Sequence, residues 1–177
     1  MKKLKGEHIH LRALEEEDII FLFEVENDED FWEVSNTTAP FSKFILKNYL
    51  ENAHLDIYTA KQLRLVISKN NSEEPIGFVD LFDFDPFHKR AGIGIMIVKS
   101  EQNKGFATES LQLIIDYCFS YLQLHQLYAN ITEDNTQSIS LFKKCNFQQT
   151  GTKKDWIYSI NNNFKDELLF QLISEKC

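Results

Sequence analysis

The sequence predicts an α/β protein in which a mixed sheet carries helices on both faces. Two observations lead to this prediction. Apolar residues alternate in several short runs, as in half-buried strands, and recur with helical spacing in several longer runs. The order of these runs is a strand, two helices, a meander of three strands, a helix, a strand, a helix and a final pair of strands. With 177 residues, 43% of them hydrophobic, the chain has enough apolar material for the core of one domain over residues 1–177.

The first half of the chain is expected to contain a short strand, two helices and a hairpin. The first helix begins with acidic residues, which favour the positive end of a helix dipole, and the second follows Ser42, whose hydroxyl can cap it. Two apolar runs on either side of the polar turn 69–75 predict the hairpin. We expect a strand over 8–11, helices over 15–27 and 43–53, an irregular segment over 28–40, and hairpin strands over 63–68 and 76–84.

The second half is expected to alternate between strands and helices. A turn over 85–90 leads into an apolar strand that contains Gly92 and Gly94. A long amphipathic pattern, another strand and a shorter helix follow, and a turn rich in Asn separates the last two strands. We expect strands over 91–98, 126–132, 156–160 and 168–173, helices over 109–122 and 135–145, and the last turn over 161–163.

The most informative segment is 102–108, because it lies between an apolar strand and a long helix. The first turn of a helix has backbone N–H groups without intrahelical partners and the positive end of the macrodipole, so it can hold a phosphate or a pyrophosphate. Gly105 lets the backbone approach a ligand closely, and Lys104 adds a positive charge. The segment therefore predicts an anion site.

Composition and charge argue against several classes of function. The net charge of −8 disfavours a nucleic-acid partner and favours a cationic one. No apolar run approaches the ~20 residues of a membrane helix, and no hydrophobic signal core follows the lysines at the start, so we expect a cytoplasmic protein without a membrane partner. The three cysteines lack metal-ligand spacing, and Cys118 and Cys145 fall on expected helices, where a small buried residue fits. We expect no metal site.

Three features of the sequence together resemble a known family. The first is the pattern of an acyl-CoA pyrophosphate loop after a strand, formed by Gln102, Lys104, Gly105 and Ala107. The second is segment 135–147, which contains the last expected helix and ends in Asn-Phe. The third is the opening of the chain, residues 9–14 with Asp18. On these residues the chain is similar, over nearly its whole length, to the GCN5-related N-acetyltransferase (GNAT) superfamily, in the branch of the ribosomal-protein and spermidine N-acetyltransferases.

The resemblance implies a GNAT fold with a central mixed sheet of about six or seven strands and helices on both faces. It implies that strands 91–98 and 126–132 are parallel neighbours that splay apart and hold acetyl-CoA, as a co-substrate, in the gap. Gly92 and Gly94 fit a close approach by the cofactor arm, and Asn135 can reach the cofactor as well as cap the last helix. The implied cofactor-binding residues are Met96, Ile97, Val98, Gln102, Asn103, Lys104, Gly105, Phe106, Ala107, Thr108, Asn135 and Phe142.

Two catalytic residues of the family are missing. The tyrosine that gives a proton to the leaving CoA thiolate in the spermidine branch is replaced by Phe142, and a glutamate early in the strand before the loop is replaced by Gly92. Because amine acetylation needs a deprotonated amine and a proton for the thiolate, other side chains become candidates.

The candidate catalytic residues are two carboxylates and two hydroxyl groups. Asp80 and Asp83 are near the expected centre, but on a regular strand they face opposite sides, so one of them is expected to act as a base through water or to attract a cationic amine. Ser138 can donate toward the thiol or only cap its helix. Tyr158, like Tyr128, can replace the absent tyrosine or only fill the core.

The acceptor is expected to be a small-molecule or peptide amine, and three alternatives stay open. A polyamine or diamine suits the acidic chain, although segment 35–40 has no acidic residues where polyamine enzymes place several. A protein N-terminal amine is the second alternative, and a CoA-binding module without turnover is the third. We expect direct transfer in a ternary complex, because Cys118 and Cys145 have no adjacent His. A homo-oligomer is possible, as in relatives.

Overall fold

The computed structural model describes residues 4–29, 31–32, 37–159 and 163–175. The strands are β1 (Ile9–Arg12), β2 (Leu63–Lys69), β3 (Pro75–Asp85), β4 (Arg90–Ile97), β5 (Gln126–Thr132), β6 (Gln148–Tyr158) and β7 (Phe164–Ile173). The helices are η2 (Glu16–Asp18) and η3 (Lys99–Glu101), both 3-10 helices, and α1 (Ile19–Glu26), α3 (Lys43–Glu51), α4 (Ile57–Ala60), α5 (Phe106–Ser120) and α6 (Thr136–Lys144).

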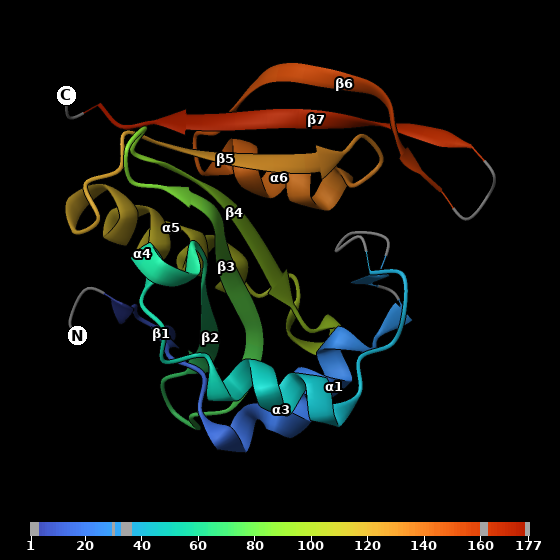
Figure 1. Ribbon diagram of the computed structural model, residues 1–177. Helices are drawn as coiled ribbons and strands as arrows, with labels where there is room; N and C mark the ends of the chain where they lie inside the picture. Colours follow the sequence, from blue (N-terminus) through green and yellow to red (C-terminus); the bar gives the residue numbers. More distant parts are fainter. Residues whose placement is uncertain (1–3, 30, 33–36, 160–162, 176–177) are drawn as a thin grey trace.

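The described strands form one seven-stranded sheet in the order β1-β2-β3-β4-β5-β7-β6 (Figure 1). All neighbouring strands pair antiparallel except β4 and β5, which are parallel. The hairpin expected around residues 69–75 is the β2–β3 pair. The mixed sheet that the sequence predicted is therefore confirmed.

Alternate side chains of the central strands form a separate core on each face of the sheet. Val66 of β2 and Phe78 of β3 pack with Leu22 of α1 on one face. Val79, the next residue of β3, belongs to the core on the other face, together with Leu111 of α5. Because successive strand residues point to opposite faces, helices must cover both, and Figure 1 shows α1 and α3 on one side and α5 and α6 on the other.

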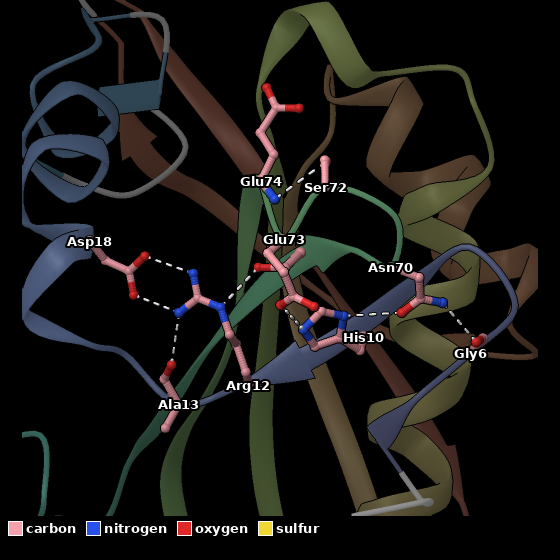
Figure 2. A network of polar contacts seen from close by, with 10 residues as sticks. Gly6, His10, Arg12, Ala13, Asp18, Asn70, Ser72, Glu73 and Glu74 are labelled. Atoms are coloured by element: carbon pink, nitrogen blue, oxygen red, sulfur yellow. Dashed lines mark hydrogen bonds and ion pairs between the residues drawn. The ribbon is translucent and has the colours of Figure 1, made fainter.

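The helix predicted over 15–27 is observed only over Ile19–Glu26, because Asp18, just before it, forms an ion pair with Arg12. The carboxylate of Asp18 accepts hydrogen bonds from both terminal nitrogens of Arg12, at 2.7 and 2.8 Å (Figure 2). It also accepts one from the N–H of Glu15 at 2.9 Å. Burial would raise the pKa of Asp18, but these hydrogen bonds outweigh burial and lower it. The pair fixes β1 to the start of α1, so the family-like opening of the chain has a structural role here.

A second set of contacts in the same view fixes the start of β1. His10 lies between Asn70, 3.0 Å from Nδ1, and Glu73, 3.2 Å from Nε2. Asn70 in turn donates to the carbonyl of Gly6 at 3.0 Å (Figure 2). The turn between β2 and β3 therefore holds the segment that precedes β1.

Two elements differ from the prediction for local reasons. The short helix α4 was not predicted; Asp56 caps it by accepting the N–H groups of Tyr58 and Thr59 at 2.8 and 3.0 Å. The strand expected over 156–160 begins instead at Gln148, because β6 is a polar edge strand without apolar alternation. Residues 160–162, which include part of the expected last turn, lie outside the described residues. Among the described helices, none is long and apolar enough to cross a membrane.

Candidate functional site

The parallel strands β4 and β5 pair only at one end. Their register joins Arg90 to Gln126 and ends with Gly92 opposite Tyr128. Past this pair β4 continues to Ile97 and β5 to Thr132, and residues of both strands line a groove between them. The splayed pair expected from the sequence is present.

Along the edge of β4 that faces the gap, only every second residue has its backbone N–H and C=O groups free. Val98 donates its N–H to the carbonyl of Ile76, 2.9 Å away, in line with the β3–β4 register. Because backbone groups of an antiparallel strand point alternately to its two sides, those of Met96 and Val98 face β3, whereas those of Ile95 and Ile97 face the gap. This corrects the expectation that the backbone of Met96 and Val98 binds the cofactor arm: both are committed to the β3 ladder.

One groove of about 1340 Å³ runs along the gap, from the turn before α5 to the face of the sheet beneath α1 and α3. Of the residues expected from the sequence to act in binding or catalysis, the groove is lined by Asp80, Met96, Ile97, Gln102, Asn103, Gly105, Phe106, Ala107, Thr108, Asn135, Ser138 and Phe142. Asp83, Val98, Lys104 and Tyr158, which the structure also describes, lie outside this lining. The fold therefore gathers most, but not all, of the candidates.

At one end the groove meets the glycine turn. Gly105 is the N-cap of α5 and has a φ of 88°, a left-handed conformation that only glycine adopts without strain. A Cβ atom built on Gly105 would have nothing within 4 Å, so the space before the first helical turn is open. The first N–H groups of α5, which begins at Phe106 and not at 109, have no intrahelical acceptors. This geometry suits an anion.

The side chains of the loop have other partners. Gln102 donates through Nε2 to the carbonyl of Ile97 at 2.9 Å, which fixes the end of β4. Lys104 lies 3.0 Å from Glu101, which also binds Lys69 at 2.8 Å, and these two contacts lower the pKa of Glu101. The positive charge expected of Lys104 is therefore partly neutralised, and the backbone carries most of the attraction for an anion.

The opposite wall of the groove comes from α6. Asn135 caps this helix, because its Oδ1 accepts the N–H of Ser138 at 3.1 Å. Both residues also line the groove, so the cap does not prevent Asn135 from meeting a ligand. Phe142 is buried and packs edge to face on Phe147, with ring centroids 5.0 Å apart. Its ring borders the groove but has no proton to donate.

The other end of the groove holds a guanidinium between two carboxylates. Arg64 donates to the two oxygens of Asp80, with Nε at 2.6 Å and Nη2 at 3.1 Å, and Nη1 donates to Glu26. Burial alone would lower the pKa of Arg64, but the attraction of Asp80 and Glu26 outweighs it and raises the pKa. One guanidinium against two carboxylates leaves one net negative charge at this end.

Aromatic rings surround this charged group. The guanidinium of Arg64 lies over the rings of Tyr49 and Phe78, 5.8 and 5.1 Å from their centroids. Burial raises the pKa of Tyr49, so its hydroxyl stays protonated at neutral pH. Phe31 lines the groove, whereas Trp32 donates from Nε1 to the carbonyl of Glu26 at 3.1 Å. Trp32 is thus held against the end of α1 by this hydrogen bond.

Asp83 and Tyr158 are not brought to the groove. Asp83 has a φ of 48° at the bulge near the end of β3, and its carboxylate accepts from the hydroxyl of Tyr128 at 3.1 Å. Burial and the charge of Asp83 raise the pKa of Tyr128 to about 12. Tyr158 is 61% exposed and packs on Phe164, with ring centroids 5.2 Å apart. The bulge that could have turned both aspartates to one site turns Asp83 to Tyr128 instead.

The two described cysteines lie in the hydrophobic core. Cys118 and Cys145 are buried, and burial raises the pKa of both thiols, which disfavours the reactive thiolate. Cys177 lies outside the described residues. Within the described part of the chain, no group of His, Cys, Asp and Glu is arranged to hold a metal ion.

Sequence reasoning missed Glu26, Arg64 and Ile95 as parts of the groove. For Arg64 a signal existed: counting outward from the middle of the turn 69–75 places it opposite Asp80, which is the observed register. For Ile95 the signal was the two-residue alternation of the strand. Glu26 comes from a helix far away in the sequence, and only the packing of α1 on the sheet places it beside Arg64.

Comparison with known protein families gives a match to the acetyltransferase (GNAT) domain over residues 8–148. Among curated proteins, the chain is 27% identical over 169 residues to spermidine N(1)-acetyltransferase of Vibrio cholerae, covering 94% of this chain and 93% of that protein. It is 31% identical over 157 residues to the uncharacterized N-acetyltransferase p20 of Bacillus licheniformis, covering 88% of each.

Solved structures give the same result for the fold. The spermidine N-acetyltransferase of Vibrio cholerae in complex with CoA and spermine matches with a TM-score of 0.83 at 27% identity, over 95% of this chain and 96% of that one. A structure of the same enzyme described as dodecameric matches with a TM-score of 0.79 at 27% identity, over 95% of each chain. The similarity extends over nearly the whole of both proteins.

Proposed function

The chain belongs to the GNAT acetyltransferase family, and on that premise we propose that it transfers the acetyl group of acetyl-CoA to a primary amine of a polyamine. Its place in the family makes it an acetyl-CoA-dependent N-acetyltransferase. The observation that carries the polyamine proposal is the similarity to spermidine N-acetyltransferases over nearly the full length of both chains. The acidic end of the groove supports it.

We propose the following placement of acetyl-CoA. The pyrophosphate lies before the first turn of α5, on the amides of residues 102–108, where Gly105 leaves open space. The pantetheine arm follows the free edge of β4 and binds the backbone groups of Ile95 and Ile97 in place of a neighbouring strand. Asn135 and Phe142 border the arm from α6. The thioester then lies toward the point where β4 and β5 rejoin.

Acetyl transfer forms a C–N bond and breaks the C–S bond of the thioester. The amine must lose a proton, and the CoA thiolate gains one on release. Asp80 is paired with Arg64 through both oxygens of its carboxylate, which disfavours its use as a base. We therefore assign Asp80 the role of attracting and orienting the acceptor ammonium group. Ser138 lines the groove and is our candidate donor to the thiolate. Neither cysteine takes part, so transfer is direct.

A polyamine suits the acceptor end because this end is acidic and partly apolar. Glu26 and Asp80 leave one net negative charge after pairing with Arg64, which favours one ammonium group. The rings of Phe31 and Tyr49 can cover the methylene chain between two ammonium groups. We assign the reaction to a primary amine, because a nitrogen at the end of the chain can reach the thioester carbonyl in the gap.

A second candidate function is a CoA-binding module with little turnover. Phe142 favours it, since the ring that borders the groove from α6 has no proton for the thiolate. We rank it below the enzyme, because positioning of the two substrates and polarisation of the carbonyl by backbone amides contribute most of the rate in reactions of this kind.

The test is release of CoA thiol, followed with a chromogenic thiol reagent. Acetyl-CoA is offered with spermidine, spermine, diamines, amino acids and short peptides with a free N-terminus. The proposal expects the highest kcat/KM with a polyamine. A higher value with the peptides would assign the enzyme to protein N-termini, and binding of acetyl-CoA by calorimetry without turnover of any amine would favour the module.

Three further points belong to the proposal. The whole chain, residues 1–177, acts as one catalytic domain, because all described strands join one sheet. A homo-oligomer is proposed from the dodecameric relative. The free, buried Cys118 and Cys145 are compatible with a reducing compartment, and we propose a cytoplasmic location.

A further inference from the structure

We infer that Phe82 limits the length of the acyl group that this enzyme transfers. The inference rests on the proposed placement of the acyl-CoA. With the pyrophosphate at the start of α5, the arm follows β4 backward from Ile97 toward Ile93, a distance of roughly 13 Å for four residues of a strand. The acyl end of the cofactor therefore lies near the last paired position of β4 and β5.

The ring of Phe82 covers β4 at this position. A Cβ atom built on Gly92 would have three ring atoms of Phe82 no more than 2.6 Å away, so the ring lies directly on the glycine backbone. A Cβ on Gly94 would lie 4.0 Å from the ring, within ordinary contact. The sequence suggested that these glycines admit a ligand, but at Gly92 the close neighbour is Phe82.

The ring also closes the groove toward β5. Phe82 and Tyr128 meet edge to face, with ring centroids 6.0 Å apart and an angle of 85° between the planes. Phe82, Ile93 and Gly94 line the groove, whereas Tyr128, which the structure also describes, does not. Phe82 is therefore the end wall of the gap on this face of the sheet.

The face is the one from which the amine approaches. Asp80 and Phe82 are two residues apart on β3, before the bulge, so both point to the side where Arg64 and Glu26 lie. The carbonyl carbon of the thioester must be open to this side for the C–N bond to form. The substituent on the carbonyl then meets the ring. An acetyl group has a single methyl to place there, whereas a longer chain needs the volume that the ring fills.

The experiment compares acyl-CoA chain lengths in the wild type and in Phe82 variants. Kcat/KM is measured for acetyl-, propionyl- and butyryl-CoA with one polyamine. A misfit of one methylene in a closed site changes specificity by roughly 10- to 200-fold, so the wild type should disfavour butyryl-CoA by about 100-fold or more. We expect Phe82→Ala to bring butyryl-CoA within about tenfold of acetyl-CoA, and Phe82→Leu to have a smaller effect.

Phe84→Leu is the matched control. Phe84 lies on the same strand but in the core of the other face, where it is 3% exposed and packs on Tyr58, so its loss weakens the core without opening the gap. Its ratio of acetyl to butyryl activity should stay that of the wild type. An unchanged ratio in Phe82→Ala and Phe82→Leu, or an equal change in Phe84→Leu, would overturn the inference.

Binding separates this inference from the proposed function. Affinities for acetyl- and butyryl-CoA are measured by calorimetry on the same variants without an amine. If no amine is turned over but Phe82→Ala alone gains affinity for butyryl-CoA, the proposed function is wrong, but the inference holds for the length of the acyl group that the protein binds. If neither CoA ester binds the wild type, the placement of the cofactor is wrong and the inference falls with it.

Discussion

Replacing Gly105 with Glu tests the anion cradle at the start of α5. The space before the helix is open, since a Cβ on Gly105 meets nothing within 4 Å, so the new side chain does not collide with the protein. It places a carboxylate where the pyrophosphate of CoA is expected. The φ of 88° also strains any residue with a Cβ, and this strain must be separated from the effect of the charge.

The size of both effects can be worked out. A carboxylate about 5 Å from one phosphate charge, at an effective dielectric constant of about 20, is repelled by about 3 kcal/mol, which corresponds to an affinity loss of roughly 100- to 300-fold. The left-handed backbone costs about 1 kcal/mol of stability for either Glu or Ala, which for a chain of this size lowers Tm by about 2–4 °C. Gly105→Ala therefore shares the strain but not the charge.

Calorimetry of CoA binding and thermal unfolding without ligand are the two assays. Gly105→Ala should lose a few degrees of Tm and keep CoA affinity within about threefold, whereas Gly105→Glu should show the same Tm and bind CoA at least about 100-fold more weakly. If Gly105→Glu binds CoA as well as Gly105→Ala does, the pyrophosphate does not lie before α5 and the placement of the cofactor is refuted.

Four further predictions concern the acceptor, the missing acid, the end wall and the N-terminal ion pair. Asp80→Asn should raise KM for the polyamine by roughly tenfold while CoA affinity by calorimetry stays unchanged; an unchanged KM would remove Asp80 from the acceptor site. Phe142→Tyr should raise kcat by up to about 100-fold, since it restores a proton donor at the groove, and an equal kcat would mean that protonation of the thiolate is not rate-limiting. Gly92→Ala should destabilise the fold by about 1–3 kcal/mol in denaturant unfolding, because the methyl group collides with the Phe82 ring, and Phe82→Leu should restore part of the loss. The pKa of Asp18 is lowered in the folded state, so its stabilisation is present above the unfolded value of about 3.9 and is lost as the pH falls through the folded value; Asp18→Asn should remove this acid-dependent part of the unfolding free energy.

The order of strands and helices could be predicted because each element has its own local signal. The hairpin and the start of α5 are marked by polar and glycine turns, and alternation marks β3 and β4. The first eight residues of β6, in contrast, are polar apart from Gly151. Its place in the sheet depends on pairing with β7, a contact between segments that no local pattern of β6 records.

The proposed cofactor side of the site has a local signal in the sequence and the proposed acceptor side does not, for a physical reason. A pyrophosphate cradle consists of consecutive backbone amides at one turn, so a short motif around Gly105 identifies it. The proposed acceptor end combines Glu26 from a helix with Arg64 and Asp80 from two strands. Side chains that meet only through packing leave no spacing to recognise, apart from the hairpin register that places Arg64 opposite Asp80.

The absence of a glutamate at position 92 and the position of the Phe82 ring are linked. The family resemblance implies a glutamate at the position of Gly92. The ring of Phe82 rests on the backbone of Gly92, so a side chain at this position requires the ring to move. A glutamate placed at 92 would displace the ring before it could act as a base. In the proposed site the ring of Phe82 closes the acyl end of the gap, and the negative charge for the acceptor comes from Asp80 and Glu26, which pair with Arg64 beside the groove. Catalysis in such a site depends on where the amine and the thioester are held, and less on a titrating side chain.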